Sequence, residues 1–134
     1  MLKQLSIYAE NKKGALQTMT NALYEAGINI WGSVTNDGAE YGINRMVVSD
    51  PDKAKEVLTE KGYLCRFVDV LAVEIEDKPG ALNTLLTALL DSNVNVDYTY
   101  LSFNRDSSTP VMILHTADPE EVEICLKAKE FKMV

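Results

Sequence analysis

The sequence contains little of the residue types that most often carry catalysis or hold metals, with one histidine and two cysteines among 134 residues. Cys65 and Cys125 match neither the spacing of a zinc knuckle nor a C-x-x-C redox pair, so we interpret both as small buried apolar residues. The sequence has no H-E-x-x-H, no phosphate-binding glycine loop and no G-x-S-x-G. We therefore expect no metal, no cofactor and no catalytic site, and the chain is not predicted to be an enzyme.

Basic residues are also scarce, because 13 Lys and Arg stand against 20 Asp and Glu and leave a net charge of −7. Such a chain repels phosphate backbones and anionic lipid surfaces, so we expect neither a nucleic-acid nor a membrane partner. No stretch approaches the about eighteen consecutive apolar residues of a membrane span, and the N-terminal residues lack the apolar segment of a signal peptide. We expect a cytoplasmic location.

The most informative feature that is present is an internal repeat. Residues 5–30 align without a gap on residues 71–96 at an offset of 66, and ten of the 26 positions are identical. Further along, Asp50-Pro51 recurs as Asp118-Pro119 at an offset of 68. The second copy therefore has two extra residues, which we assign to the turn around Asn104 to Thr109, because hairpin turns tolerate insertions.

Hydrophobic periodicity predicts the same elements in each copy. Apolar residues alternate at 5–9 and 71–75, which is typical of a half-buried strand, and then recur at helical spacing at 15–26 and 81–89. Each helix is followed by residues suited to a C-terminal cap, Gly27 in one copy and Ser92-Asn93 in the other. Beta-branched residues resume at Ile28 and Val94, where we place the second strands.

Turn residues at Asn36-Asp37-Gly38 and at 104–107 divide each second strand from a third, at 41–48 and 111–116. Asp50 and Asp118 each precede a proline, which predicts the start of a second helix, with Glu121 spaced for a capping interaction. These helices run on to Lys61 and Lys129. A fourth strand at 66–70 passes directly into the first strand of the second copy.

The predicted fold class is α+β, with two tandem ferredoxin-like βαββαβ modules at residues 1–68 and 69–134. Each module is expected to be an antiparallel sheet with its two helices on one face. The second copy ends soon after Phe131, so its fourth strand is either short or completed by another chain. Because many unrelated functions use this fold, the fold alone decides no function.

The first turn of the second copy reads Asp77-Lys78-Pro79-Gly80-Ala81-Leu82, and Asn95 stands just ahead of the next strand. This arrangement resembles the motif that opens the first helix of ACT domains. The resemblance covers nearly the whole chain, twice, and is closest to small tandem ACT proteins with no attached enzyme. It implies a regulatory protein in which pairs of modules bind a free amino acid at their shared interface. It also implies an enzyme of amino-acid metabolism as a further partner. We expect a homodimer as well, because edge strands and a half-exposed sheet face favour pairing.

The candidate ligand-binding residues are the first-turn and asparagine positions of both copies: Asn11, Lys12, Lys13, Gly14, Ala15, Leu16, Asn29, Ile30, Asp77, Lys78, Pro79, Gly80, Ala81, Leu82, Asn95 and Val96. A glycine at the first turn lets an α-carboxylate approach unpaired helix N–H groups, which the helix dipole favours. We expect an asparagine beside it to satisfy the ligand's polar groups. Asp77 would face an α-ammonium better than the neutral Asn11 does, so the two sites would differ in affinity.

Structural explanations stand beside these functional ones. The glycines also suit tight strand-to-helix turns, and the asparagines suit loops with unusual backbone angles. Trp31, Tyr98 and Tyr100 lie on the predicted second strands, where packing explains them as well as ligand recognition does. His115 has Val47 as its counterpart and is interpreted as a sheet-face residue. The alternative function is an interaction subunit that docks on a separate metabolic enzyme without a ligand of its own.

Overall fold

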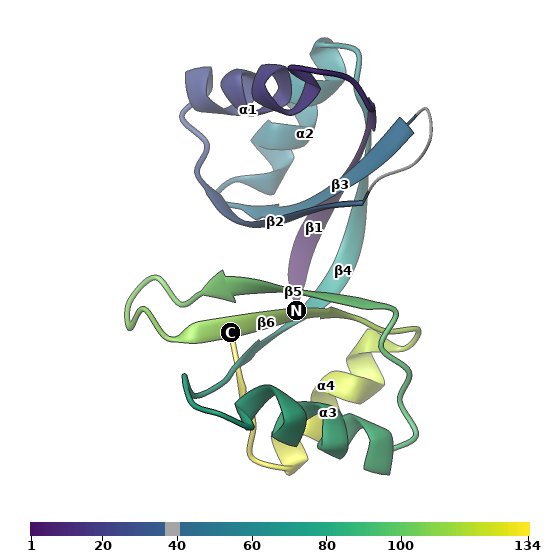
Figure 1. Ribbon diagram of the computed structural model, residues 1–134, viewed down its shortest axis with the longest axis vertical. Coiled ribbons are helices and arrows are strands. Elements are labelled where there is room, and N and C mark those ends of the chain that lie inside the picture. The colour runs from purple at the N-terminus through teal and green to yellow at the C-terminus, as the bar shows by residue number, and fades with distance from the viewer. Residues whose placement is uncertain (37–40) are drawn as a thin grey trace. The chain divides into compact units, whose positions relative to one another are not determined.

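The computed structural model describes residues 1–36 and 41–134, which divide into two compact units. Lys3–Val68 is called the first module, and Asp69–Val134 together with Met1–Leu2 the second module. The elements are β1 (Leu2–Glu10), α1 (Ala15–Glu25), β2 (Ile30–Asn36), β3 (Tyr41–Val48), α2 (Pro51–Glu60), β4 (Leu64–Glu74), α3 (Ala81–Asp91), β5 (Tyr98–Phe103), β6 (Pro110–His115), α4 (Pro119–Ala128) and β7 (Lys132–Met133) (Figure 1). This order confirms the predicted α+β class of two βαββαβ repeats.

Each module forms an antiparallel sheet with the strand order of a ferredoxin-like fold. The order is β2-β3-β1-β4 in the first module and β5-β6-β4-β7 in the second. Within each module both helices cover one face of the sheet (Figure 1). β4 is a single strand of 11 residues that ends the first repeat and begins the second, as the sequence predicts. β7 is short, with two residues.

The helices hold their sheets through one apolar face each. α1 buries Met19 and Leu23 against strand residues such as Ile7. α3 buries Leu85 and Leu89 against strand residues such as Val73, the counterpart of Ile7. Full burial of one such side chain stabilises a fold by about 1.5–3 kcal/mol. These two cores fix the position of each first helix, and therefore of the glycine turn before it.

The second strands begin later than the sequence predicts, at Ile30 and Tyr98. The N–H of Ile28 donates to the carbonyl of Leu23 at 3.0 Å, and that of Val94 donates to Leu89 at 2.9 Å. These bonds close the C-terminal turns of α1 and α3, so the same N–H groups do not join a sheet. Beta-branched residues at these positions therefore belong to the helix cap.

The connections after the second strands differ in length as predicted. The described strands leave six residues between β5 and β6 but four between β2 and β3. Asn104 organises the longer turn, since its Oδ1 accepts from the N–H of Asp106 at 2.9 Å. Residues 37–40, which include most of the predicted Asn36-Asp37-Gly38 turn, lie outside the described residues.

The two second helices start differently. The Asp50 carboxylate accepts a hydrogen bond from the N–H of Lys53 at 3.1 Å, which is the predicted N-cap. Asp118 occupies the same place before α4, but its side chain makes no capping hydrogen bond. α4 therefore begins after the predicted N-cap residue but without the side-chain hydrogen bond that caps α2.

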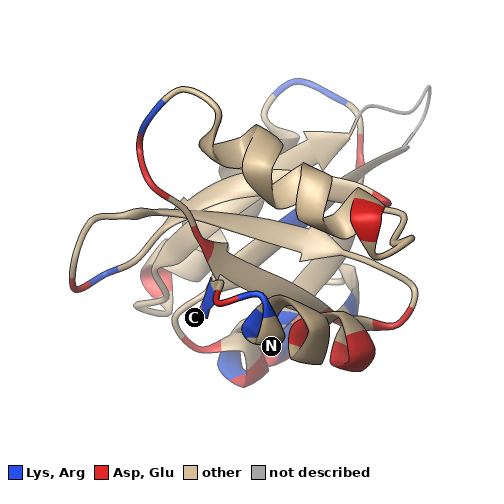
Figure 2. Cartoon of the chain, turned by 90° about the horizontal axis from the view of Figure 1, so that it is seen from below, with Lys and Arg blue, Asp and Glu red and all other residues tan. Residues whose placement is uncertain are grey.

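None of the described helices is long and apolar enough to cross a lipid bilayer. Lys and Arg positions lie close to Asp and Glu positions at several places along the ribbon (Figure 2).

Candidate functional site

Both first helices begin at a glycine in the left-handed backbone region. Gly14 has φ 84° and Gly80 has φ 88°. The glycine carbonyls accept from the N–H groups of Thr18 at 3.0 Å and Thr84 at 2.9 Å. The N–H groups of Ala15 and Ala81 donate to the carbonyls of Lys12 at 3.1 Å and Lys78 at 3.2 Å. The N–H groups of the next two residues have no intrahelical acceptor, because they belong to the first turn of a helix. Each module therefore presents a helix N-terminus that favours an anion.

In the first module a groove of about 300 Å³ lies beside this turn. Its lining includes the turn residues Asn11, Lys12, Gly14, Ala15 and Leu16, and the strand residues Ala9, Glu10, Thr35, Asn36, Gly42 and Asn44, together with Gln17. We call it the Gly14 groove. It joins backbone donors at a helix start to polar side chains on two neighbouring strands.

The floor of the Gly14 groove contains a polar cluster on the helix-facing side of the sheet. Asn44 is 4% exposed, and its amide Nδ2 donates to Thr35 Oγ1 at 2.7 Å and to Ser33 Oγ at 3.2 Å. Buried amides are kept only where hydrogen bonds compensate their desolvation, and here strand neighbours supply them. Asn44 is therefore fixed in orientation.

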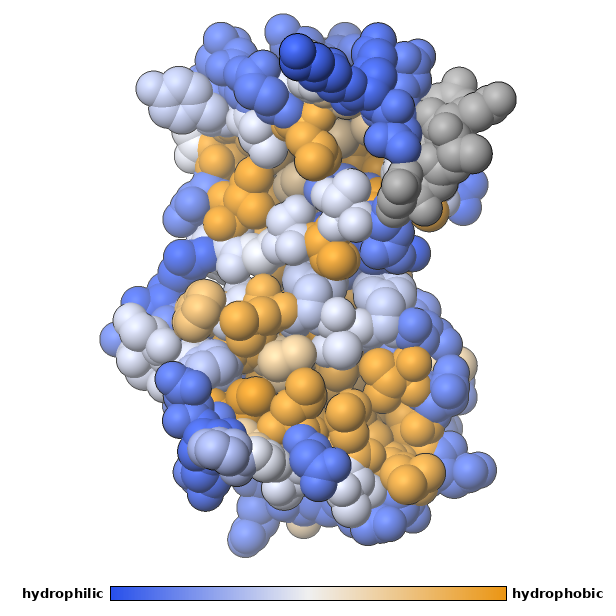
Figure 3. Space-filling model, in the orientation of Figure 1, coloured by the Kyte–Doolittle hydropathy of each residue, from blue (hydrophilic) through white to orange (hydrophobic). Residues whose placement is uncertain are grey.

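The second module has apolar residues at the equivalent positions. Thr35 corresponds to Leu101 and Asn44 to Met112, because Leu101 pairs with Met112 in the same register as Thr35 with Asn44. Leu101 and Phe103 on β5 are 49% and 51% exposed. Hydrophobic side chains gather over α3 and β5 in this module (Figure 3). The two repeats thus share a backbone but differ in the chemistry of this groove.

Each module has its own second hollow on the other side of the glycine turn. Its volume is about 470 Å³ in the first module and about 360 Å³ in the second. Each contains an ion pair between residues two apart. Lys12 Nζ lies 3.0 Å from Glu10, and Lys78 Nζ lies 2.8 Å from Glu76. Both pairs are largely exposed, so they contribute little to stability.

Asn29 and Ile30, like Asn95 and Val96, lie at the far end of the helix from the glycine. The eleven residues of α1 or α3 span about 16 Å, so glycine and asparagine of one module cannot contact the same amino acid. This corrects the expectation that they lie side by side. The backbone of Asn29 is tied to Ser49, with two bonds of 2.9 Å.

The remaining predicted residues belong to the glycine turns and differ in their exposure. Asn11 lines the Gly14 groove, whereas its counterpart Asp77 is exposed together with Pro79. Lys13 lines only the second hollow. In the second module Ala81 is buried and Leu82 is 37% exposed.

Sequence reasoning missed Thr35, Asn36 and Asn44. A signal was available in the repeat itself, because the aligned positions in the second copy include Leu101 and Met112. Where one repeat has a polar residue and the other has an apolar residue at the aligned core position, the two copies are candidates for different functions.

The described residues contain no group of three or more His, Cys, Asp and Glu side chains placed to hold a metal. His115 Nδ1 lies 2.8 Å from Asp97 Oδ2, and its ring stacks on Tyr98 at 4.9 Å between centroids. Cys65 and Cys125 are free, and burial raises the pKa of the Cys65 thiol. A raised pKa leaves little thiolate, which suits a structural cysteine.

The family described as ACT domain pair matches residues 1–134. Among solved structures, protein BT0572 from Bacteroides thetaiotaomicron is 31% identical, with a TM-score of 0.91 over 99% of this chain and 91% of that one. The regulatory subunits of aspartate kinase from Thermus thermophilus and Thermus flavus have TM-scores of 0.68 and 0.62. They are 16% and 19% identical and align over 94% and 96% of this chain, and 88% and 91% of their own. No curated protein sequence matches the chain.

Proposed function

Because the chain belongs to the ACT domain pair family, we propose that it is a non-catalytic regulatory protein whose first module binds a free amino acid in the Gly14 groove. One observation carries the proposal. The groove combines a helix N-terminus at Gly14 with the fixed amide of Asn44, and it exists in this polar form only in the first module's sequence.

The groove matches the chemical groups of an amino acid. The α-carboxylate would bind the N–H groups of the first turn of α1, where the helix dipole favours an anion. The α-ammonium would bind acceptor oxygens, which Asn11, Asn36 and Glu10 offer along the rim. Ala15 and Leu16 provide apolar surface for the side chain, and about 300 Å³ suits a small ligand.

Asn29 and Asn95 can contribute to this binding site only if two modules associate. Since Asn29 lies about 16 Å from Gly14 along α1, an asparagine that contacts the same ligand must come from another module. We propose that a homodimer supplies it, with Asn29 and Ile30 or Asn95 and Val96 as the contributing pairs. The second module, with Leu101 and Met112 at the equivalent positions, binds amino acids weakly or not at all in this scheme.

A regulatory role is supported by the fold, which is similar to that of aspartate kinase regulatory subunits. An enzyme partner is part of the proposal.

The alternative function, a subunit that docks on an enzyme without a ligand, is favoured by one observation. Leu82, Leu86 and Leu90 follow each other at helical spacing on the outer side of α3 and are 37%, 37% and 75% exposed. Together with Leu101 and Phe103 they form an apolar surface of the kind that protein partners cover.

Thermal unfolding of the whole chain with each of the twenty amino acids tests the proposal. A ligand at a hundred times its Kd stabilises the fold by about 2.7 kcal/mol, which raises the melting temperature measurably. Asn44→Met, which copies Met112, is expected to abolish the rise, whereas Leu101→Thr, which copies Thr35 into the second module, preserves it. If no amino acid raises the melting temperature, amino-acid binding is refuted. Capture of an enzyme that Leu86→Glu abolishes would then favour the docking subunit.

A further inference from the structure

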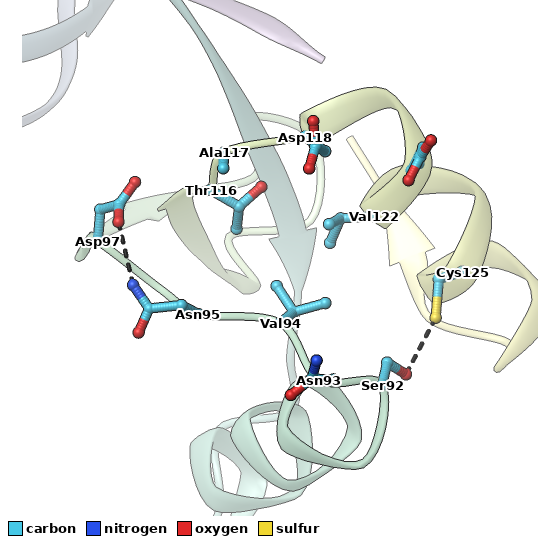
Figure 4. Close-up of a pocket in the computed structure, with 11 residues that line it drawn as sticks. Ser92, Asn93, Val94, Asn95, Asp97, Thr116, Ala117, Asp118, Val122 and Cys125 are labelled. Atoms are coloured by element: carbon cyan, nitrogen blue, oxygen red, sulfur yellow. Dashed lines mark hydrogen bonds between the residues drawn. The ribbon is translucent and has the colours of Figure 1, made fainter.

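The second module contains a hollow of about 430 Å³ at the end of α3 that is remote from Gly80 (Figure 4). Its walls are the end of α3, the segment that leads to β5, the β6–α4 connection and the first two turns of α4. The lining residues are Ser92, Asn93, Val94, Asn95, Asp97, Thr116, Ala117, Asp118, Glu121, Val122 and Cys125. We call it the Thr116 hollow. It shares no lining residue with the Gly14 groove, although its Asn95 is also one of the asparagines proposed to reach that groove in a dimer.

Thr116 gives the first indication that the hollow is built for a ligand. The residue is 2% exposed, and its hydroxyl oxygen has no hydrogen-bond partner among the described residues. Burial of a hydroxyl without a partner is destabilising. The side chain lines the hollow and stands among Val94, Val122 and Asp118 in Figure 4. A valine would fill the same space without this cost, so a ligand that uses the hydroxyl explains the threonine.

The charges around the hollow have one sign. Asp97, Asp118 and Glu121 line it, and no lysine or arginine does. Asp118 lies at the start of α4 without capping it, unlike Asp50 in the first module. Asp97 is held by two neighbours, with Asn95 Nδ2 at 3.1 Å and His115 Nδ1 at 2.8 Å. The carboxyl end of α3 adds a partial negative charge.

The first module shows that the fold itself does not demand these polar residues. At the repeat offsets of 66 and 68, Thr116 corresponds to Val48, Asp97 to Trp31, and Glu121 to Lys53. Val48 is buried in the first module's core. Asp118 keeps an acidic counterpart in Asp50, but the polar or acidic residues at 97, 116 and 121 are particular to the second module.

We propose that the Thr116 hollow binds a small aliphatic amine in its cationic form. The ammonium group donates hydrogen bonds to the Thr116 hydroxyl and lies near the Asp118 and Glu121 carboxylates, while the alkyl chain rests on Val94 and Val122. A metal ion is a poorer fit, because the described residues offer no group of three ligands placed to hold one. The proposal does not rest on the amino-acid site, because none of the groups that recognise the amine lines the Gly14 groove.

The experiment is titration of the ¹⁵N-labelled chain with 1,4-diaminobutane, followed by backbone amide chemical shifts. Saturable shifts confined to 92–97 and 116–125 are expected. Thr116→Val removes the hydroxyl at nearly constant volume and is expected to weaken binding about tenfold without loss of folding, since the hydroxyl has no partner to lose. Glu121→Gln is expected to weaken binding about threefold to fivefold. The matched control Glu120→Gln changes the same charge one residue away, outside the hollow, and should leave binding unchanged.

Three outcomes overturn the proposal. Absence of saturable shifts up to about 10 mM diamine removes the site. Equal weakening by Glu120→Gln and Glu121→Gln shows only attraction of a cation to an acidic surface. Equal binding of 1-butanol shows that the cationic group is not recognised. The Asn44→Met variant is expected to retain diamine binding, so failure of the amino-acid proposal is distinguished from failure of this one.

Discussion

Replacement of the two turn glycines by alanine isolates the contribution of their backbone conformation. A Cβ at Gly14 or Gly80 meets no atom within 4 Å, so alanine introduces no steric clash. Both residues nevertheless have φ between 84° and 88°, where an L-residue is disfavoured by about 1–2 kcal/mol. We expect Gly14→Ala and Gly80→Ala each to lower the free energy of unfolding by that amount. Asparagine should cost less, because it tolerates this region better.

The measurement is urea unfolding, in which the midpoint should fall while the slope stays constant. Glu130→Gly provides the mirrored test, since Glu130 has φ 68° at the position that corresponds to Gly62 in the first module. Relief of strain there should outweigh the added entropy of the unfolded chain and stabilise the protein by up to about 1 kcal/mol. Unchanged stability of Gly14→Ala would refute the conformational argument. A decrease in the free energy of unfolding far above about 2 kcal/mol would contradict the claim that the added Cβ meets no neighbouring atom.

Two further outcomes are expected. Leu85→Ala, at a fully buried position of α3, should cost about 2–5 kcal/mol in thermal unfolding, whereas its exposed neighbour Leu86→Ala should cost far less; equal losses would contradict the assigned helix face. The hydrogen bond from Lys132 holds the pKa of Glu74 below its usual range, so Glu74 stabilises the fold above the unfolded pKa and loses this contribution as the pH falls through its folded pKa. Lys132→Met should raise the Glu74 pKa in a carboxyl NMR titration and reduce the acid dependence of stability, and an unchanged pKa would exclude this cause.

The repeat made most of the fold predictable, because the hydrophobic pattern of each element occurs in both copies and indicates the same structure in each. Alternation and helical spacing located the strands and helices, and the shared Asp-Pro pairs located α2 and α4. The starts of β2 and β5 were missed because the cap bonds of Ile28 and Val94 depend on how each helix ends, which hydrophobic pattern does not encode.

The candidate site was predictable in part. The glycine turns follow from the local sequence, but the partners of Gly14 across the groove depend on strand register. Asn44 reaches the groove only because β3 pairs with both β1 and β2. The sequence of a single strand does not show which residues of the neighbouring strands will lie beside a polar side chain. The separation of Gly14 from Asn29 follows from helix length, which the sequence already contained.

The divergence of the two modules at the positions of Thr35 and Asn44 has a consequence for how such a protein can evolve. Once a module is duplicated within one chain, one copy can keep recognition while the other accumulates substitutions that recognition would forbid. Here the exchange of Thr35 and Asn44 for Leu101 and Met112 separates the two chemistries on one backbone. The double substitution Leu101→Thr with Met112→Asn would therefore place the polar pair of the Gly14 groove, Thr35 and Asn44, at the equivalent positions of the second module.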